Sequence, residues 1–176
     1  MSGDTSQSNG VNELMIASLQ GNVSRVRQIL SDNSHILYSN NRNGVTALDY
    51  AVSGHQYPVI DVMLGFGLNL DSQDSQGLNV LHRCVLASML DKVEFCVHLG
   101  VDMNGCNSSG ETALMMAVNL GSEDIVRYLI KMGCEVNCRN RDGYTALENA
   151  FFRNHLGIQV MINDAVKRGS GYCVRT

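Results

Sequence analysis

Apolar residues recur along the chain in short runs at helical spacing, and polar segments rich in Asn, Asp and Gly separate these runs. The clearest example is a pair of short helices, the first ending at Gly121 and the second spanning residues 124–130 before Gly133. Each predicted helix is apolar on one side, so the two are expected to pack together. Their apolar positions are Leu114, Ala117 and Val118, then Ile125, Val126, Leu129 and Ile130.

This two-helix pattern repeats with a period of 33 residues, which is marked by Gly44, Gly77, Gly110 and Gly143. Each glycine opens a phrase that follows, or departs slightly from, the form Gly-x-Thr-Ala-Leu-x-x-Ala. A fixed period of this length is typical of a solenoid. The sequence therefore predicts a mostly α-helical solenoid of about five helix-turn-helix units, linked by projecting hairpin loops with turn-forming residues.

The 176 residues fit one domain. The first and last units depart from the pattern, as expected of caps that each expose one face to water. We expect repeats at residues 11–40, 41–73, 74–106, 107–139 and 140–168, with a disordered lead at 1–10 and a short tail at 169–176.

Charge and hydropathy narrow the classes of partner. The net charge is −4 and Lys and Arg are not clustered, which argues against a nucleic-acid or anionic-membrane binder. No apolar run is long enough to span a bilayer, and the N-terminal segment has no apolar core of a signal peptide.

The sequence contains few candidate catalytic or metal-binding residues. Cys134 and Cys138 are the closest cysteines, but their spacing is not that of a zinc ribbon or redox motif. The cysteines are interpreted as structural or free thiols, which predicts a reducing compartment, the cytoplasm or the nucleus. No catalytic motif or phosphate-binding loop occurs, so we expect no enzyme, no cofactor, no small-molecule substrate and no metal site.

The repeated phrase, the turn at Gly121 and the ending from Gly133 to Asn137 resemble the ankyrin repeat over residues 11–168. The family's Thr-Pro-Leu-His motif has lost its proline in every copy, and its histidine survives only at His82. In the family, that Thr and His connect neighbouring hairpins by hydrogen bonds. The resemblance therefore implies an ankyrin fold with weakened connections between its repeats.

The resemblance also implies a concave partner-binding surface, formed by the hairpin tips and the exposed sides of the first helices. Several of the corresponding positions hold apolar or aromatic residues, and a contiguous apolar surface favours an interface. We expect Tyr144, Phe152 and Arg153 to be the main anchors, because aromatic residues and Arg dominate interface energetics. The predicted partner-binding residues are Leu19, Val45, Leu78, Leu86, Leu120, Arg141, Tyr144, Phe152 and Arg153.

The resemblance implies a non-enzymatic protein-protein interaction module that regulates or scaffolds a partner. In size and build the chain is similar to small ankyrin-only regulators of cell-cycle protein kinases, which makes a Ser/Thr protein kinase our first hypothesis for the partner. The alternative hypothesis is a cytoplasmic retainer or inhibitor of a transcription factor, similar to the inhibitors of NF-κB-type factors.

The decay of the Thr-Pro-Leu-His motif predicts a marginally stable array. We expect the purified protein to melt at or below about 65 °C, within the usual range for mesophile domains, because most of the family's connections between hairpins are missing. Calorimetry or circular dichroism measures this directly. A fully cooperative transition well above that temperature would contradict the prediction.

Overall fold

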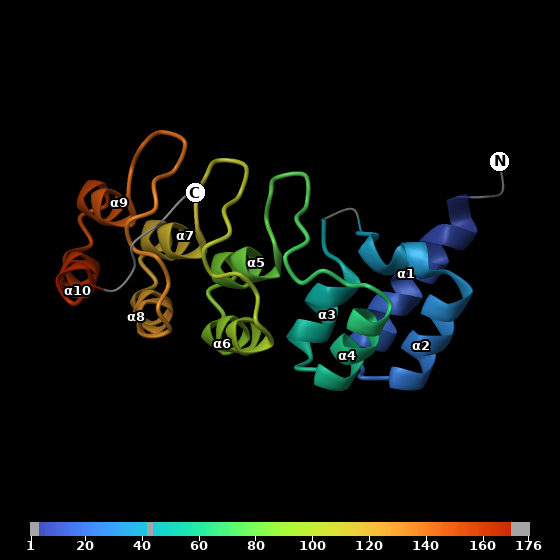
Figure 1. Ribbon diagram of the computed structural model, residues 1–176. Coiled ribbons are helices and arrows are strands. Elements are labelled where there is room, and N and C mark those ends of the chain that lie inside the picture. Colours follow the sequence, from blue (N-terminus) through green and yellow to red (C-terminus); the bar gives the residue numbers. More distant parts are fainter. Residues whose placement is uncertain (1–3, 42–43, 170–176) are drawn as a thin grey trace. The chain divides into compact units, whose positions relative to one another are not determined.

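A computed structural model describes residues 4–41 and 44–169, without the side chains of residues 4–9. These residues form ten α-helices in five successive pairs and one 3-10 helix, η1 (Figure 1). The predicted helix-turn-helix solenoid is confirmed. The helices are α1 (Asp4–Leu19), α2 (Val23–Asp32), α3 (Ala47–Ser53), α4 (Tyr57–Gly65), α5 (Val80–Leu86), α6 (Leu90–Leu99), α7 (Ala113–Leu120), α8 (Glu123–Lys131), α9 (Ala146–Phe152) and α10 (Leu156–Lys167); η1 is Ser34–Tyr38.

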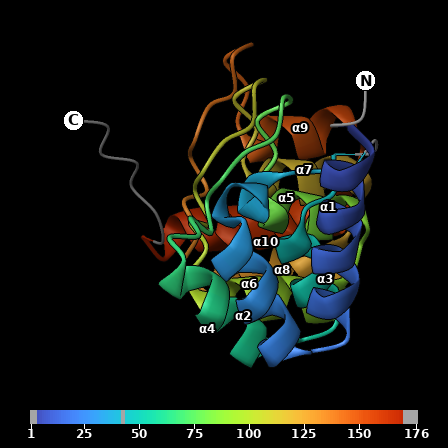
Figure 2. The ribbon, with the colours of Figure 1, turned by 90° about the vertical axis from the view of Figure 1, so that its right-hand side faces the viewer.

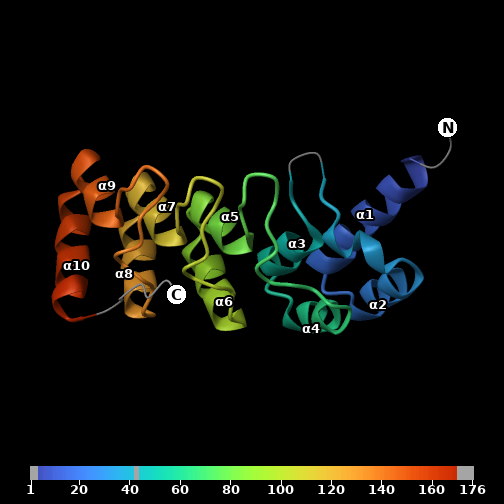
Figure 3. The same ribbon diagram turned by 45° about the horizontal axis from the view of Figure 1, so that its top comes forward.

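The chain divides into two compact units, Met1–Leu70 and Asp71–Thr176, where the sequence predicted one domain. A solenoid can divide into compact units between any two repeats, because each repeat contacts only its neighbours. In the first unit α1 packs against α3 and α2 against α4. In the second unit α5, α7 and α9 form one layer, and α6, α8 and α10 form the other (Figure 3).

The first helix begins earlier than predicted. Helix α1 starts at Asp4, so residues 4–10 are helical and do not form the disordered lead that the sequence predicted. Extending an existing helix fixes the backbone of one residue for each hydrogen bond gained, whereas nucleating a new helix fixes three residues for its first hydrogen bond. The conformational cost of extension is therefore much lower. Residues 1–3, and residues 170–176 of the predicted tail, lie outside the described residues.

The Thr of each repeated phrase, or the Asn in its place, starts a first helix by accepting a hydrogen bond from a backbone N–H one turn later. In two repeats an acidic side chain completes a capping box: the Thr46 N–H donates to Asp49 at 2.7 Å and the Thr145 N–H donates to Glu148 at 2.6 Å. Asp49 and Glu148 stand where the family has histidine, so the substitution preserves the helix start. The four N-cap residues are Thr46, Asn79, Thr112 and Thr145.

The hairpin loops of the second unit lie side by side and project to the same side of the helices (Figures 1 and 2). Backbone hydrogen bonds join successive loops: the Ser108 N–H donates to the Gln76 carbonyl at 2.9 Å, and the Arg141 N–H donates to the Ser109 carbonyl at 3.0 Å. The two bonds occupy equivalent positions in successive repeats. The hairpins therefore stack in a fixed register.

The turn between the two helices of a pair has a left-handed backbone at one equivalent position of the second to fifth repeats. Gly121 supplies it without strain at φ 70°, whereas His55, Ser88 and Asn154 adopt it at φ 52°, 54° and 58°. A left-handed backbone costs a residue with a side chain roughly 1–2 kcal/mol, and Asn tolerates it best. This cost is a second source of weakness, besides the decayed motif.

His82 is the one histidine at the family's motif position, and it is fully buried. The backbone N–H of Asn79 donates to the ring Nδ1 of His82 at 3.2 Å, and the backbone N–H of His82 donates to the side-chain oxygen of Asn79 at 3.0 Å. Burial lowers the pKa of His82 below 6.5. The nearby carbonyl groups of Gly105 and Glu111 favour the protonated ring, but the cost of burying the charge outweighs them. Neither carbonyl meets hydrogen-bond geometry at the buried Nε2.

His82 makes stability depend on pH. The pKa of His82 in the folded chain lies below 6.5, its value in the unfolded chain. As the pH falls, His82 is therefore protonated in the unfolded chain first, and this favours unfolding. The contribution to stability is complete above pH 6.5 and is lost as the pH falls. We expect the melting temperature to fall between about pH 7.5 and pH 5.5, and to fall less steeply in His82→Gln. The exposed His35→Gln is the control and should keep the wild-type pH dependence; an equally steep fall in His82→Gln would refute the prediction.

Gly110 and Gly143 share a left-handed backbone but differ in how closely other atoms surround them, so substituting each one distinguishes backbone strain from steric crowding. Gly110 has φ 76° and Gly143 has φ 85°, so alanine is strained at both. A Cβ at Gly110 would lie 2.8 Å from the Arg141 backbone nitrogen, whereas a Cβ at Gly143 meets nothing within 4 Å. We expect Gly110→Ala to unfold at lower urea concentration, with about 1–2 kcal/mol more lost than in Gly143→Ala, because it also disturbs the bond to Ser109. Equal losses would show that the hairpin stack does not constrain this position.

Candidate protein-binding surface

The nine predicted binding residues divide between the two compact units. Leu19, at the end of α1, is 43% exposed, and Val45 is half-buried, so only part of the Val45 side chain is accessible. Both belong to the first unit. The other seven belong to the second unit, where α5, α7 and α9 pack side by side.

Leu78 does not belong to the surface. The sequence predicted it as an exposed hairpin residue, but it is only 8% exposed. Its hairpin is covered by the next one: a Cβ at the adjacent Gly77 would lie 2.5 Å from the backbone nitrogen of Ser108. An inner hairpin therefore buries this position.

The remaining six predicted residues of the second unit are exposed. We call this set the first-helix face, because its members lie at the ends of α5, α7 and α9 or on the hairpin that precedes α9. Three of its apolar side chains are large and accessible: Leu86 at 48%, Leu120 at 47% and Phe152 at 69%. The full set is Leu86, Leu120, Arg141, Tyr144, Phe152 and Arg153.

Two aromatic residues of the first-helix face are in direct contact. The rings of Tyr144 and Phe152 meet edge to face, with centroids 5.1 Å apart and planes at 81°. Tyr144 comes from the hairpin and Phe152 from the last turn of α9. The equivalent positions one repeat earlier hold Glu111 and Asn119, which are joined by a hydrogen bond of 2.8 Å. The last repeat thus replaces a polar pair by an aromatic pair that is largely open to solvent.

Sequence reasoning missed three strongly exposed apolar residues of the last repeat. Phe151 is 57% exposed, Leu156 67% and Val160 61%. The period contained the signal for Phe151: its equivalents in the inner repeats are buried, and no described repeat follows the fifth to cover it. Those equivalents are Val52, Val85 and Val118, at 1%, 0% and 0% exposure.

The described cysteines are free thiols, and most are buried. Cys84 and Cys96 are neighbours in the core, with sulfur atoms 3.8 Å apart. Burial raises the pKa of Cys134 to about 12, which keeps that thiol protonated and unreactive. Cys173 lies outside the described residues. Among residues 4–41 and 44–169, no group of His, Cys, Asp and Glu is placed to hold a metal ion, and no helix is long and apolar enough to cross a membrane.

Comparison with known proteins gives two findings. A family model described as ankyrin repeats matches residues 81–168 in three copies, which is half of the chain. The chain is also similar to the RelA-associated inhibitor of Mus musculus, with 35% identity over 69 residues. That alignment covers 39% of this chain and 8% of the relative, so the chain spans only a small part of the relative's length.

Proposed function

The chain belongs to the ankyrin-repeat family, and on this basis we propose that it is a non-enzymatic regulatory subunit that binds a transcription factor through its first-helix face. Ankyrin repeats are protein-protein interaction modules, and solenoids of this kind offer extended surfaces to other macromolecules. A partner of this class would be met in the cytoplasm or the nucleus, and we propose that the protein acts there.

The observation that carries this proposal is the exposed aromatic pair of Tyr144 and Phe152. Large aromatic side chains are costly to leave in water, and they are the residues that most often dominate the energy of an interface. Each ring restrains the other, so less side-chain entropy is lost when a partner covers them. Arg153 and Arg141 lie exposed on the same face and supply hydrogen-bond donors at its rim.

The choice of partner class is supported by the similarity to the RelA-associated inhibitor, whose name associates it with RelA, a transcription factor. This favours the second of the two hypotheses drawn from the sequence, a retainer or inhibitor of an NF-κB-type factor. The first hypothesis, a cell-cycle protein kinase, remains a prediction from size and build alone.

The test is affinity purification of the tagged protein from native extract, followed by mass spectrometry, with wild type and the double variant Tyr144→Ala, Phe152→Ala. We expect a transcription factor to co-purify with wild type, and its recovery to fall at least about tenfold with the double variant, because two interface anchors are removed. Stability should change by less than about 1 kcal/mol, since both side chains face solvent.

The matched control is the double variant Leu156→Ala, Val160→Ala. It removes exposed apolar surface from the same repeat, but on α10 instead of α9. It should retain the partner. Normal recovery by the Tyr144, Phe152 variant would reject the first-helix face as the binding surface, and recovery of a protein kinase in place of a transcription factor would restore the first hypothesis.

A further inference from the structure

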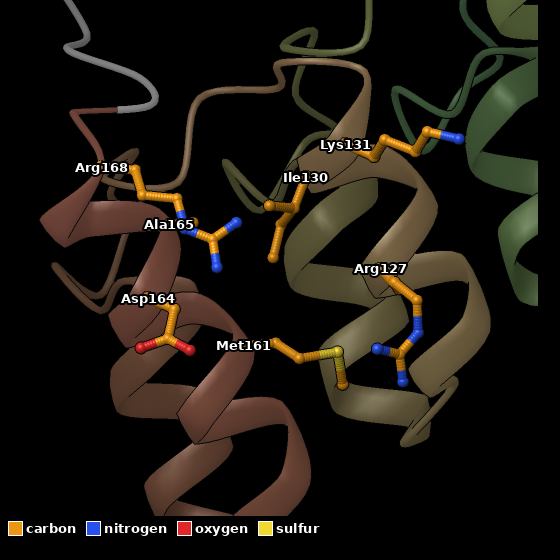
Figure 4. A pocket seen from close by; sticks show the side chains of 7 residues that line it. All are labelled: Arg127, Ile130, Lys131, Met161, Asp164, Ala165 and Arg168. Atoms are coloured by element: carbon orange, nitrogen blue, oxygen red, sulfur yellow. The ribbon is translucent and has the colours of Figure 1, made fainter.

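The second helices of the last two repeats enclose a groove that the proposed function does not use. The groove lies between α8 and α10 and has a volume of about 520 Å³, within the size range of ligand sites. We call it the outer groove. Its lining residues are Arg127, Ile130, Lys131, Met161, Asp164, Ala165 and Arg168 (Figure 4).

Helical spacing explains how the two walls are built. On α8, Arg127 and Lys131 are four residues apart, and on α10 Asp164 and Arg168 are four residues apart, so each pair lies on one helix face. Ile130 is half-buried between the walls. Together with Met161 and Ala165 it gives the groove an apolar floor.

Charge distinguishes this groove from the rest of the molecule. Its walls carry three cationic side chains and one carboxylate, in a chain whose net charge is −4. None of the three cations forms an ion pair or side-chain hydrogen bond with any residue in the described parts of the chain. In Figure 4, Arg168 reaches from α10 into the space beside Ile130, Arg127 extends along α8 toward the end of the Met161 side chain, and Lys131 extends away from the groove.

Helix geometry accounts for some of these cations but not all. Lys131 is the last residue of α8 and Arg168 caps α10, so both also stabilise the negative end of a helix dipole. Arg127 lies in the middle of α8, where the dipole gives it no such role. Two guanidinium groups that face a shared apolar floor form a good site for carboxylates, which Arg binds through two parallel hydrogen bonds.

We propose that the outer groove binds a short acidic segment of a partner protein, with one apolar side chain on the floor and a carboxylate on each side of it. The chain's own segment 170–176 is a poor match, since it contains no Asp or Glu side chain. An anionic membrane surface also fits less well, because the site is a groove between two helices and the chain carries excess negative charge. Asp164 opposes the ligand and thereby limits its affinity.

The experiment is a fluorescence-polarisation titration of the full chain with the labelled, end-capped peptide Gly-Glu-Asp-Leu-Glu-Asp-Gly. We expect the double reversal Arg127→Glu, Arg168→Glu to raise Kd at least about tenfold, because both carboxylate partners are replaced by like charges. Asp164→Asn should lower Kd roughly threefold by removing the opposing charge. A merely structural role of these residues predicts no tightening.

The matched control is Arg27→Glu, which changes the net charge as much as the single reversal Arg127→Glu but at an exposed position of the first compact unit, outside the groove. Arg27→Glu should shift Kd by less than about twofold at physiological ionic strength, where long-range charge effects are screened, and Arg127→Glu should raise Kd more than that. The variant Tyr144→Ala, Phe152→Ala should bind the probe like wild type, which separates this site from the first-helix face. Thermal melts confirm that all variants fold.

Three outcomes would overturn the proposal. The first is equal affinity of wild type and the Arg127, Arg168 reversal for the probe. The second is about tenfold tighter binding by a chain that ends at Gly169, which would assign the groove to the chain's own C-terminal residues. The third is binding to vesicles that contain phosphatidylserine without binding to the peptide, which would assign the cationic surface to a membrane.

Discussion

Backbone hydrogen bonds between neighbouring hairpins set the spacing on which the rest of the second unit depends. The N–H groups of Ser108 and Arg141 each reach a carbonyl of the preceding hairpin. The two chains approach so closely that a Cβ at Gly77 or Gly110 would collide with the next backbone. At Gly77 and Gly110, glycine is therefore a steric requirement as well as a turn preference. Because the hairpins are in register, each first helix packs on the next with the same offset along its axis. Equivalent positions of successive repeats therefore meet each other.

This regularity makes the environment of a residue depend on whether another repeat follows. Leu78 and Tyr144 occupy the same position of the repeat, but a following hairpin buries Leu78, whereas Tyr144 is 42% exposed. Val118 and Phe151 show the same contrast on the first helices. Apolar residues at repeat positions that are buried in the inner repeats are exposed in the fifth, which no described repeat follows. This effect exposes Tyr144, and the local exchange of a polar pair for an aromatic pair gives the first-helix face its aromatic character.

The period and the phrase around Gly44, Gly77, Gly110 and Gly143 contain nearly all the information on the fold, because turns and caps are local. They could not predict that α1 begins at Asp4, since the gain from extending a helix is small and has no sequence signature. The exposure of individual side chains was harder to predict. Leu78 was wrongly predicted as exposed because its burial comes from a hairpin 33 residues away. The outer groove was not predicted either, because two helices build it together. Binding through the six residues of the first-helix face stays a prediction.

The two surfaces of the last repeats differ in the physical range over which they act. The aromatic pair on α9 gains energy only when water is expelled, so it acts at contact and depends little on salt. The guanidinium groups of Arg127 on α8 and Arg168 at the end of α10 act over about a Debye length, roughly 8 Å, before screening removes their field. Excess negative charge elsewhere repels an acidic partner at longer distance. Under the two proposals, a partner docked on the first-helix face would hold its acidic segment near the outer groove and so raise the local concentration of that segment. The weaker electrostatic contact would then discriminate among partners that share the same aromatic contact.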